Sequence, residues 1–94
     1  MESFYLMKKK YTSQIGDHIT LADLKKGQKG KVLFLNTADS ATRRKLLDMG
    51  ITEGVQIKIK KVAPLGDPID CELRGYELCL RKEDLKMIDV EVIR

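Results

Sequence analysis

Apolar and polar residues alternate along much of the second half of the chain, and this alternation predicts short strands with one buried face. The predicted strands cover residues 55–59, 69–73, 76–80 and 88–92. Val62 breaks the alternation of the first strand, which predicts a bulge at Lys60 and Lys61. A tight hairpin turn is expected at Arg74 and Gly75, between the second and third strands.

The same alternation assigns the side chains of the predicted hairpin to two faces. Cys71 falls on the inner face of one strand, whereas Cys79 falls on the outer face of the other. Tyr76 opens the second strand and has the parity of the inner face, like Leu78 and Leu80 after it. We therefore expect Tyr76 to point into the core.

One further strand is expected at residues 31–36, where four apolar residues follow one another directly. Such a run is typical of a strand that is covered on both faces. Phe34 is accordingly expected in the interior. A second layer of structure must then cover the outer face of this strand.

A helix is predicted at residues 40–49, immediately after that strand. Asp39 or Ser40 can cap its first turn, and Gly50 is placed as the left-handed residue that ends it. Its apolar stripe consists of Leu46, Leu47 and Met49. Because the connection is short, we expect this stripe to cover the outer face of the preceding strand.

The length and the element pattern together predict one domain. A chain of 94 residues has the size of a single small domain. About five short strands, a bulge, tight turns and one helix favour an all-β fold with an inserted helix, or β-rich α+β, arranged as a small, partly open antiparallel barrel. The domain is expected to cover residues 19–94. Residues 1–18 show neither the alternation of a strand nor the repeat of a helix, and they are expected to form a loosely ordered extension.

Composition and charge narrow the class of protein. Apolar residues make up 43% of the chain and charged residues 34%. The net charge is +4, and basic and acidic residues are interspersed along the chain. This mild bias suits an acidic partner, but the aromatic residues offer no stacking platform beside basic groups, so we predict no nucleic-acid binding. No apolar run reaches membrane-spanning length and no signal peptide is evident, so a cytoplasmic protein is expected. The oligomeric state stays undetermined.

Catalysis and metal binding find little support in the residue pattern. The chain has one histidine, His18, and no recognisable set of nucleophile, base and acid, so we predict that it is not an enzyme. Cys71 and Cys79 are predicted to face opposite ways and to stay reduced. No cofactor is required and no metal ligands are assigned. Binding of a metal ion is left open as an alternative.

Partner binding is the remaining interpretation, and five residues are candidates for it. Leu47 and Met49 lie at the edges of a broad apolar stripe that a small barrel need not bury completely. Leu65 occupies the tip of a loop bounded by proline and glycine. Arg44 and Lys45 add positive charge to the same helix and would steer an acidic partner.

Five segments follow one another in a specific order: Leu46-Leu47-Asp48-Met49-Gly50-Ile51, Gly54-Val55, Pro64-Leu65-Gly66-Asp67-Pro68-Ile69, Arg74-Gly75-Tyr76-Glu77-Leu78 and Leu80-Arg81-Lys82. Their order and spacing closely resemble the FeoA family, ferrous iron transport protein A. The likeness covers roughly residues 20–92. Glu53 stands where the family commonly has proline, and Leu85 lies near a position where alanine is frequent.

The resemblance implies an SH3-like barrel with an inserted helix. It also implies a small cytosolic companion of FeoB, the ferrous iron permease that carries a cytoplasmic GTPase domain. The expected function is therefore that of a non-enzymatic accessory protein of ferrous iron uptake that docks on FeoB at the inner face of the membrane. The alternative is a metal-responsive module that itself binds Fe²⁺ or Zn²⁺. Whether such a protein stimulates GTP hydrolysis, gates transport or assembles the complex is not determined by the sequence.

Overall fold

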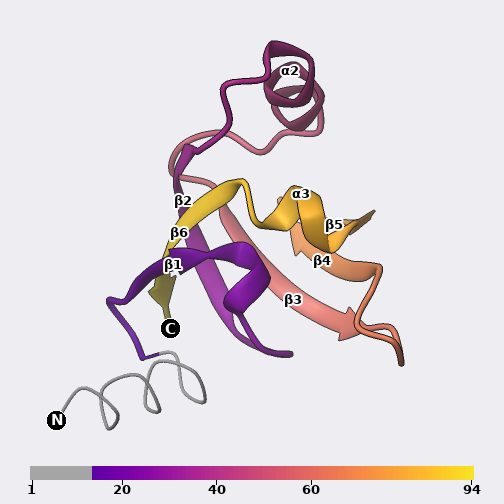
Figure 1. Cartoon of the computed structure of the whole chain (residues 1–94). Helices are drawn as coiled ribbons and strands as arrows, with labels where there is room; N and C mark the ends of the chain where they lie inside the picture. The colour runs from indigo at the N-terminus through magenta and orange to yellow at the C-terminus, as the bar shows by residue number, and fades with distance from the viewer. Residues whose placement is uncertain (1–13) are drawn as a thin grey trace, which may run out of the picture.

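The computed structural model describes residues 14–94, which form one curled antiparallel sheet and three short helical segments (Figure 1). The strands are β1 (His18–Thr20), β2 (Lys29–Leu35), β3 (Gln56–Val62), β4 (Ile69–Leu73), β5 (Tyr76–Leu80) and β6 (Ile88–Ile93). The helical segments are η1 (Leu21–Asp23), α2 (Ser40–Asp48) and α3 (Lys82–Leu85). The predicted all-β fold with an inserted helix is thus confirmed, with six strands in place of about five.

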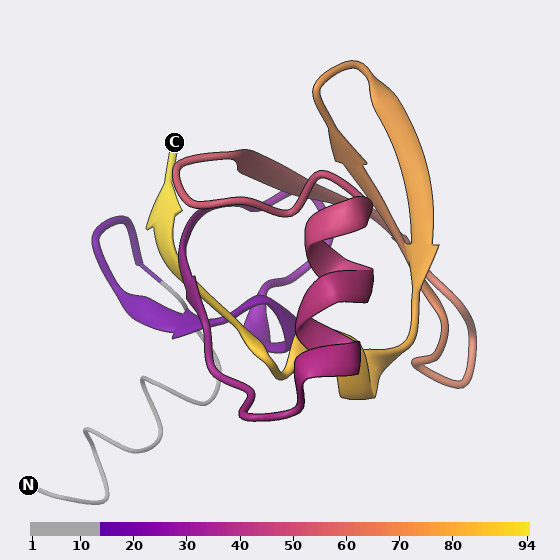
Figure 2. The same ribbon diagram turned by 90° about the horizontal axis from the view of Figure 1, so that it is seen from above.

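The six strands lie in the order β1-β6-β2-β3-β4-β5, so β1 and β5 form the two edges of an open sheet. All neighbouring strands pair antiparallel. The sheet curls so far that its concave face encloses the core, as the view from above shows (Figure 2). The architecture is therefore a partly open barrel.

The folded domain begins before Ile19. The backbone N–H of Gly16 donates to the carbonyl of Val92 at 2.8 Å, and the N–H of Val92 donates to the carbonyl of Asp17 at 2.8 Å. His18 then pairs with Glu91 at the start of β1. The expectation of a loosely ordered extension is therefore wrong for residues 14–18, and its remaining part, residues 1–13, lies outside the described residues.

Two register shifts bend the barrel. Ile59 pairs with Cys71 and Lys61 with Asp70, so one residue of β3 is left over between them, which confirms the predicted bulge. A second shift lies between Val32 and Phe34 in the pairing of β2 with β6. This second bulge is where the sequence prediction fails.

Phe34 is exposed, with 55% of its surface accessible, and the expectation of a strand buried on both faces is wrong. Val32 and Leu35 do enter the core, whereas Phe34 points away from it. The helix that was expected to cover the outer face of β2 lies elsewhere, and Phe34 stays exposed.

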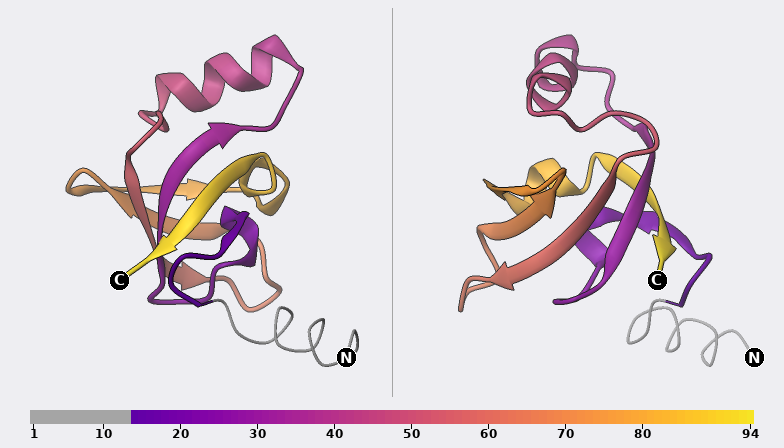
Figure 3. Two further views of the ribbon diagram at one scale, coloured as in Figure 1. Left: turned by 90° about the vertical axis from the view of Figure 1, so that its left-hand side faces the viewer. Right: turned by 180° about the vertical axis from the view of Figure 1, so that it is seen from behind.

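Helix α2 crosses one open end of the barrel and does not cover the outer face of β2 (Figures 2 and 3). Leu46 is its one buried side chain and, with Ile51 after the helix, reaches into the core from above. As predicted, Asp39 caps the helix: its carboxylate accepts bonds from the Thr42 N–H at 3.1 Å and hydroxyl at 2.5 Å. These two bonds lower the pKa of Asp39.

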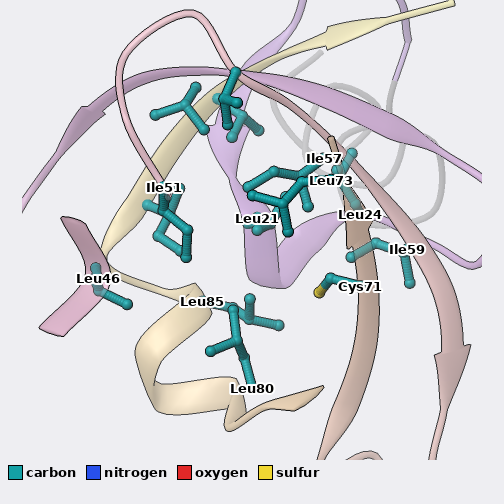
Figure 4. Packing of buried hydrophobic residues seen from close by; sticks show 14 of the residues in the cluster. Leu21, Leu24, Leu46, Ile51, Ile57, Ile59, Cys71, Leu73, Leu80 and Leu85 are labelled. Atoms are coloured by element: carbon teal, nitrogen blue, oxygen red, sulfur yellow. The ribbon is translucent and has the colours of Figure 1, made fainter. Parts of the chain in front are cut away.

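The core is a single cluster of aliphatic side chains from every strand except β1, together with η1, α2 and α3. Figure 4 shows Leu46 and Ile51 approaching this cluster from one side and Cys71 lying within it. The inner positions that alternation predicted for β3, β4 and β6 are all buried, whereas Val62, which breaks the alternation, is exposed. The alternating pattern therefore identifies most of the core.

Candidate functional site

The C-terminal end of α2 is held by the β4–β5 hairpin, and this junction shapes the candidate site. The Tyr76 hydroxyl donates to the carbonyl of Met49 at 2.6 Å. The Arg74 guanidinium donates to Oγ1 of Thr52 at 3.2 Å. Both bonds join the tip of the hairpin to the segment that leaves the helix, so the end of α2 has a defined position on the barrel.

Gly50 makes this junction sterically feasible. Its φ of +90° lies in the left-handed region that glycine adopts without strain. A Cβ atom at this position would lie 2.6 Å from the Tyr76 hydroxyl oxygen. Glycine is therefore needed twice here, for the backbone conformation and for the close approach of the tyrosine.

Tyr76 is the part of this junction that the alternation misplaced. It has the inner-face parity, since it pairs with the buried Leu73, yet 42% of its surface is accessible. The hairpin carries its tip past the edge of the core, so Tyr76 meets the helix end and not the barrel interior. The sequence did hold a signal for this position, because a tyrosine hydroxyl usually needs a hydrogen-bond partner when the ring packs, and an aliphatic core offers none.

Leu47 is the exposed apolar residue of α2, with 44% of its surface accessible. Met49 is half-buried and packs against the core cluster. Of the two apolar residues of this helix segment that were predicted to contact a partner, the structure thus leaves Leu47 available and uses Met49 partly for packing. We call Leu47, Arg44 and Tyr76 the α2 surface.

The basic residues of α2 have different environments. Lys45 forms an ion pair with the buried Asp84, 3.1 Å from Nζ to Oδ2, and so joins α2 to α3. Arg43 donates to the carbonyl of Thr37 at 2.6 Å and to that of Leu35 at 3.3 Å, which joins α2 to the end of β2. The side chain of Arg44 makes no hydrogen bond or ion pair with the rest of residues 14–94. Its charge is therefore free to face a partner.

Leu65 is not brought together with the α2 surface. It lies at the tip of the β3–β4 loop, with 96% of its surface accessible. This loop and α2 lie at opposite ends of the molecule (Figures 1 and 3). Asp67 in the same loop accepts a hydrogen bond from the Lys82 N–H at 2.8 Å, which holds the loop to the start of α3.

The candidate metal ligands are dispersed. Cys71 is buried and Cys79 is exposed, as predicted. Burial raises the pKa of the Cys71 thiol to about 12, with smaller contributions from Asp70 and Cys79. A hydrogen bond to Asp70 is the main cause that raises the pKa of Cys79. Both thiols thus favour the protonated form, and residues 14–94 contain no group of three His, Cys, Asp or Glu side chains placed to hold an ion.

Within residues 14–94, no helix has the length and apolar character needed to cross a membrane. The longest, α2, has 9 residues.

The chain resembles proteins of ferrous iron transport in sequence and in fold. Residues 19–92 match the family described as the FeoA domain. The NMR structure of an FeoA-like protein from Clostridium acetobutylicum is 44% identical, with a TM-score of 0.75 over 87% of this chain and 92% of that chain. The crystal structure of Stenotrophomonas maltophilia FeoA complexed with zinc, a protein described as a prokaryotic SH3 domain protein, is 22% identical. Its TM-score is 0.69, over 78% of this chain and 89% of that chain, and this likeness supports the SH3-like fold.

A curated relative combines two transport components in one polypeptide. The Fe(2+) transport protein A/Fe(2+) transporter FeoB fusion protein of Porphyromonas gingivalis is 39% identical to this chain over 51 residues. The match covers 54% of this chain but only 6% of the relative. Most of that relative therefore has no counterpart in this chain.

Proposed function

The chain belongs to the FeoA family, which takes part in ferrous iron transport, and we propose that it is a non-enzymatic accessory protein that docks on the cytoplasmic, GTPase-containing part of an FeoB-type permease. The observation that carries this proposal is the fusion of an FeoA-like segment with FeoB in Porphyromonas gingivalis. Covalent linkage keeps two modules at high effective concentration, which benefits modules that bind one another.

The α2 surface is the docking site that we propose on this chain. Leu47 presents an exposed apolar side chain, and buried apolar anchors contribute strongly to protein interfaces. Arg44 supplies an unpaired positive charge beside it, which accelerates association with an acidic surface. Three contacts hold the helix in place before binding: the ion pair of Lys45, the hydrogen bonds of Arg43 and the hydrogen bond of Tyr76. A helix held in this way loses little conformational entropy on docking.

Binding to the purified cytoplasmic part of FeoB tests the proposal. We expect the wild-type chain to bind in at least one of four conditions, with and without guanine nucleotide and with and without ferrous iron. Leu47→Asn should weaken binding about tenfold or more, because truncating or replacing an interface anchor costs more than about 1.4 kcal/mol. Leu65→Asn is the matched control, an exposed leucine at the opposite end of the molecule.

The outcomes separate the protein's role from its site. Absence of binding in every condition, with a folded sample, contradicts the accessory role. Equal affinities of the wild type and Leu47→Asn would contradict the α2 surface as the site. A loss of affinity in Leu65→Asn alone would move the site to the β3–β4 loop.

Intrinsic binding of Fe²⁺ or Zn²⁺ is the alternative function, and it requires ligands that residues 14–94 do not group together. Calorimetric titration under anaerobic conditions decides this question. A metal site should saturate at a fixed stoichiometry and lose affinity as the pH falls, since its ligands then become protonated. Such a result would favour the metal-responsive module over the accessory role.

A further inference from the structure

A shallow groove of about 210 Å³ lies where β2, β3 and β4 meet the tip of the β4–β5 hairpin. The side chains that line it include three cations, one carboxylate and one amide: Lys29, Lys58, Arg74, Glu72 and Gln56. The groove is formed by the outer face of the sheet, because the neighbouring Ile57 and Cys71 face the core. It is thus separate from α2, which covers the open end of the barrel.

The register places the charges of this groove in one row. Lys29 pairs with Lys58, and Lys58 pairs with Glu72 on the next strand. Adjacent strands lie about 4.8 Å apart, so the two lysines stand side by side. Like charges directly opposite each other destabilise a sheet. In this register Lys58 faces Glu72 on its other side, whereas Lys29 faces Ile93 and has no acidic partner opposite it.

The two lysines also lack internal partners. The ion pairs among residues 14–94 join Lys45 with Asp84 and Arg81 with Asp67, and neither Lys29 nor Lys58 takes part in one. Although Glu72 is the register partner of Lys58, no ion pair joins them. Both ammonium groups are thus available to an external anion.

Arg74 adds a positioned cation at the end of the groove. It donates one hydrogen bond to Thr52 at 3.2 Å, which fixes the guanidinium near the hairpin tip. A guanidinium has five N–H donors, so most of them remain for a ligand. A carboxylate fits this fork in a bidentate manner.

We propose that this groove binds an extended acidic segment of a partner protein, with carboxylates on Lys29, Lys58 and Arg74. The cations are spread along a row of strands, which suits successive acidic side chains. Phosphate sites instead gather backbone N–H groups around one point, at a helix N-terminus or a nest. The Glu72 carboxylate accepts a hydrogen bond from a peptide N–H, and the Gln56 amide both donates and accepts.

Fluorescence anisotropy with labelled hexaglutamate tests this assignment at low salt. Hexaglutamate should bind, and the double variant Lys29→Gln/Lys58→Gln should weaken binding about three- to tenfold, the effect of losing two exposed charge pairs. The matched control Lys82→Gln/Lys86→Gln removes the same charge from α3 and the C-cap residue that follows it. It should bind nearly as well as the wild type. The groove variant should also keep or raise its melting temperature, since it loses a like-charge pair.

Three results would overturn the assignment. The first is absence of hexaglutamate binding by the wild type at low salt. The second is an equal loss of affinity in the α3 control, which would mean that net charge alone attracts the peptide. The third is displacement of hexaglutamate by inorganic phosphate at concentrations below those of the peptide, which would identify a phosphate site. In NMR spectra, changes of amide chemical shift on addition of hexaglutamate that are confined to β2, β3 and the β4–β5 hairpin would support the groove as the binding site.

Discussion

Substitution of Gly50 by alanine probes the contact that holds the end of α2. The new Cβ would have two effects. It would strain a backbone with φ +90°, and it would lie 2.6 Å from the Tyr76 hydroxyl oxygen. Because that oxygen ends a flexible side chain, we expect the tyrosine to shift and lose its hydrogen bond to the Met49 carbonyl.

The expected magnitude combines these two effects. The left-handed conformation costs a residue with a Cβ about 1 to 2 kcal/mol. Loss of the tyrosine hydrogen bond adds about 0.5 to 1.5 kcal/mol. Gly50→Ala should therefore lower the free energy of unfolding by about 1.5 to 3.5 kcal/mol. Gly54→Ala is the matched control, because Gly54 has φ +88° but a Cβ added there would meet no atom within 4 Å. It should show the conformational cost alone.

Urea unfolding of four proteins measures the contact itself: the wild type, Gly50→Ala, Tyr76→Phe and the double variant. Phenylalanine removes the hydroxyl and leaves the ring carbon 3.9 Å from the new Cβ, an ordinary contact. The hydrogen bond can be lost only once, so the double variant should be more stable than the sum of the single effects predicts, by about 1 kcal/mol. Additive effects within error, or equal losses in Gly50→Ala and Gly54→Ala, would refute this account of the junction.

Three further predictions concern charged and titratable groups. Lys45→Gln leaves the buried Asp84 carboxylate without its ion-pair partner, so it should lower the free energy of unfolding by about 1 kcal/mol. The melting temperature should fall by about 4 to 8 °C, and an unchanged melting temperature would contradict a stabilising ion pair. Iodoacetamide should modify the exposed Cys79 well before the buried Cys71, and modification of Cys71 first, seen by mass spectrometry, would refute its burial. Because the pKa of the Cys71 thiol is raised from 9.0 to about 12, the contribution of the buried thiol to stability should be lost as the pH rises from 9.0 to about 12. The pKa of Asp39 is lowered in the folded state, so the carboxylate should stabilise the fold above pH 3.8 and lose this contribution as the pH falls below that value. In urea unfolding, Asp39→Ala should therefore reduce the loss of stability at acid pH, and an unchanged dependence of stability on pH would contradict the cap.

Local patterns in the sequence determined most of the strands and the helix boundaries. Alternation identified β3, β4 and β6 because each has one covered face, and a period of two needs no knowledge of the partner strand. The bulge at Lys60 was equally visible, since an extra residue shifts the parity of the residues after it. The cap at Asp39 and the stop at Gly50 depend on the residues next to them.

The burial of β2 could not be predicted from the local pattern in the same way. Four consecutive apolar residues predict two covered faces, but the helix that was expected to cover the outer one crosses the open end of the barrel. Phe34 is exposed as a result. The position of a helix depends on where its apolar side chains can pack, and the curled sheet places that position where Leu46 meets the core cluster (Figure 4).

The sequence by itself determined an all-β domain with an inserted helix, the order of its elements apart from β1, and its resemblance to the FeoA family. Only the tertiary structure decided which candidate residues remain available to a partner. It separated Leu47 from Leu65, paired Lys45 with Asp84 and brought Tyr76 to the end of α2. The physical reason is that accessibility and charge pairing arise between segments far apart in the chain, whereas hydrophobic period, caps and turns arise between neighbours.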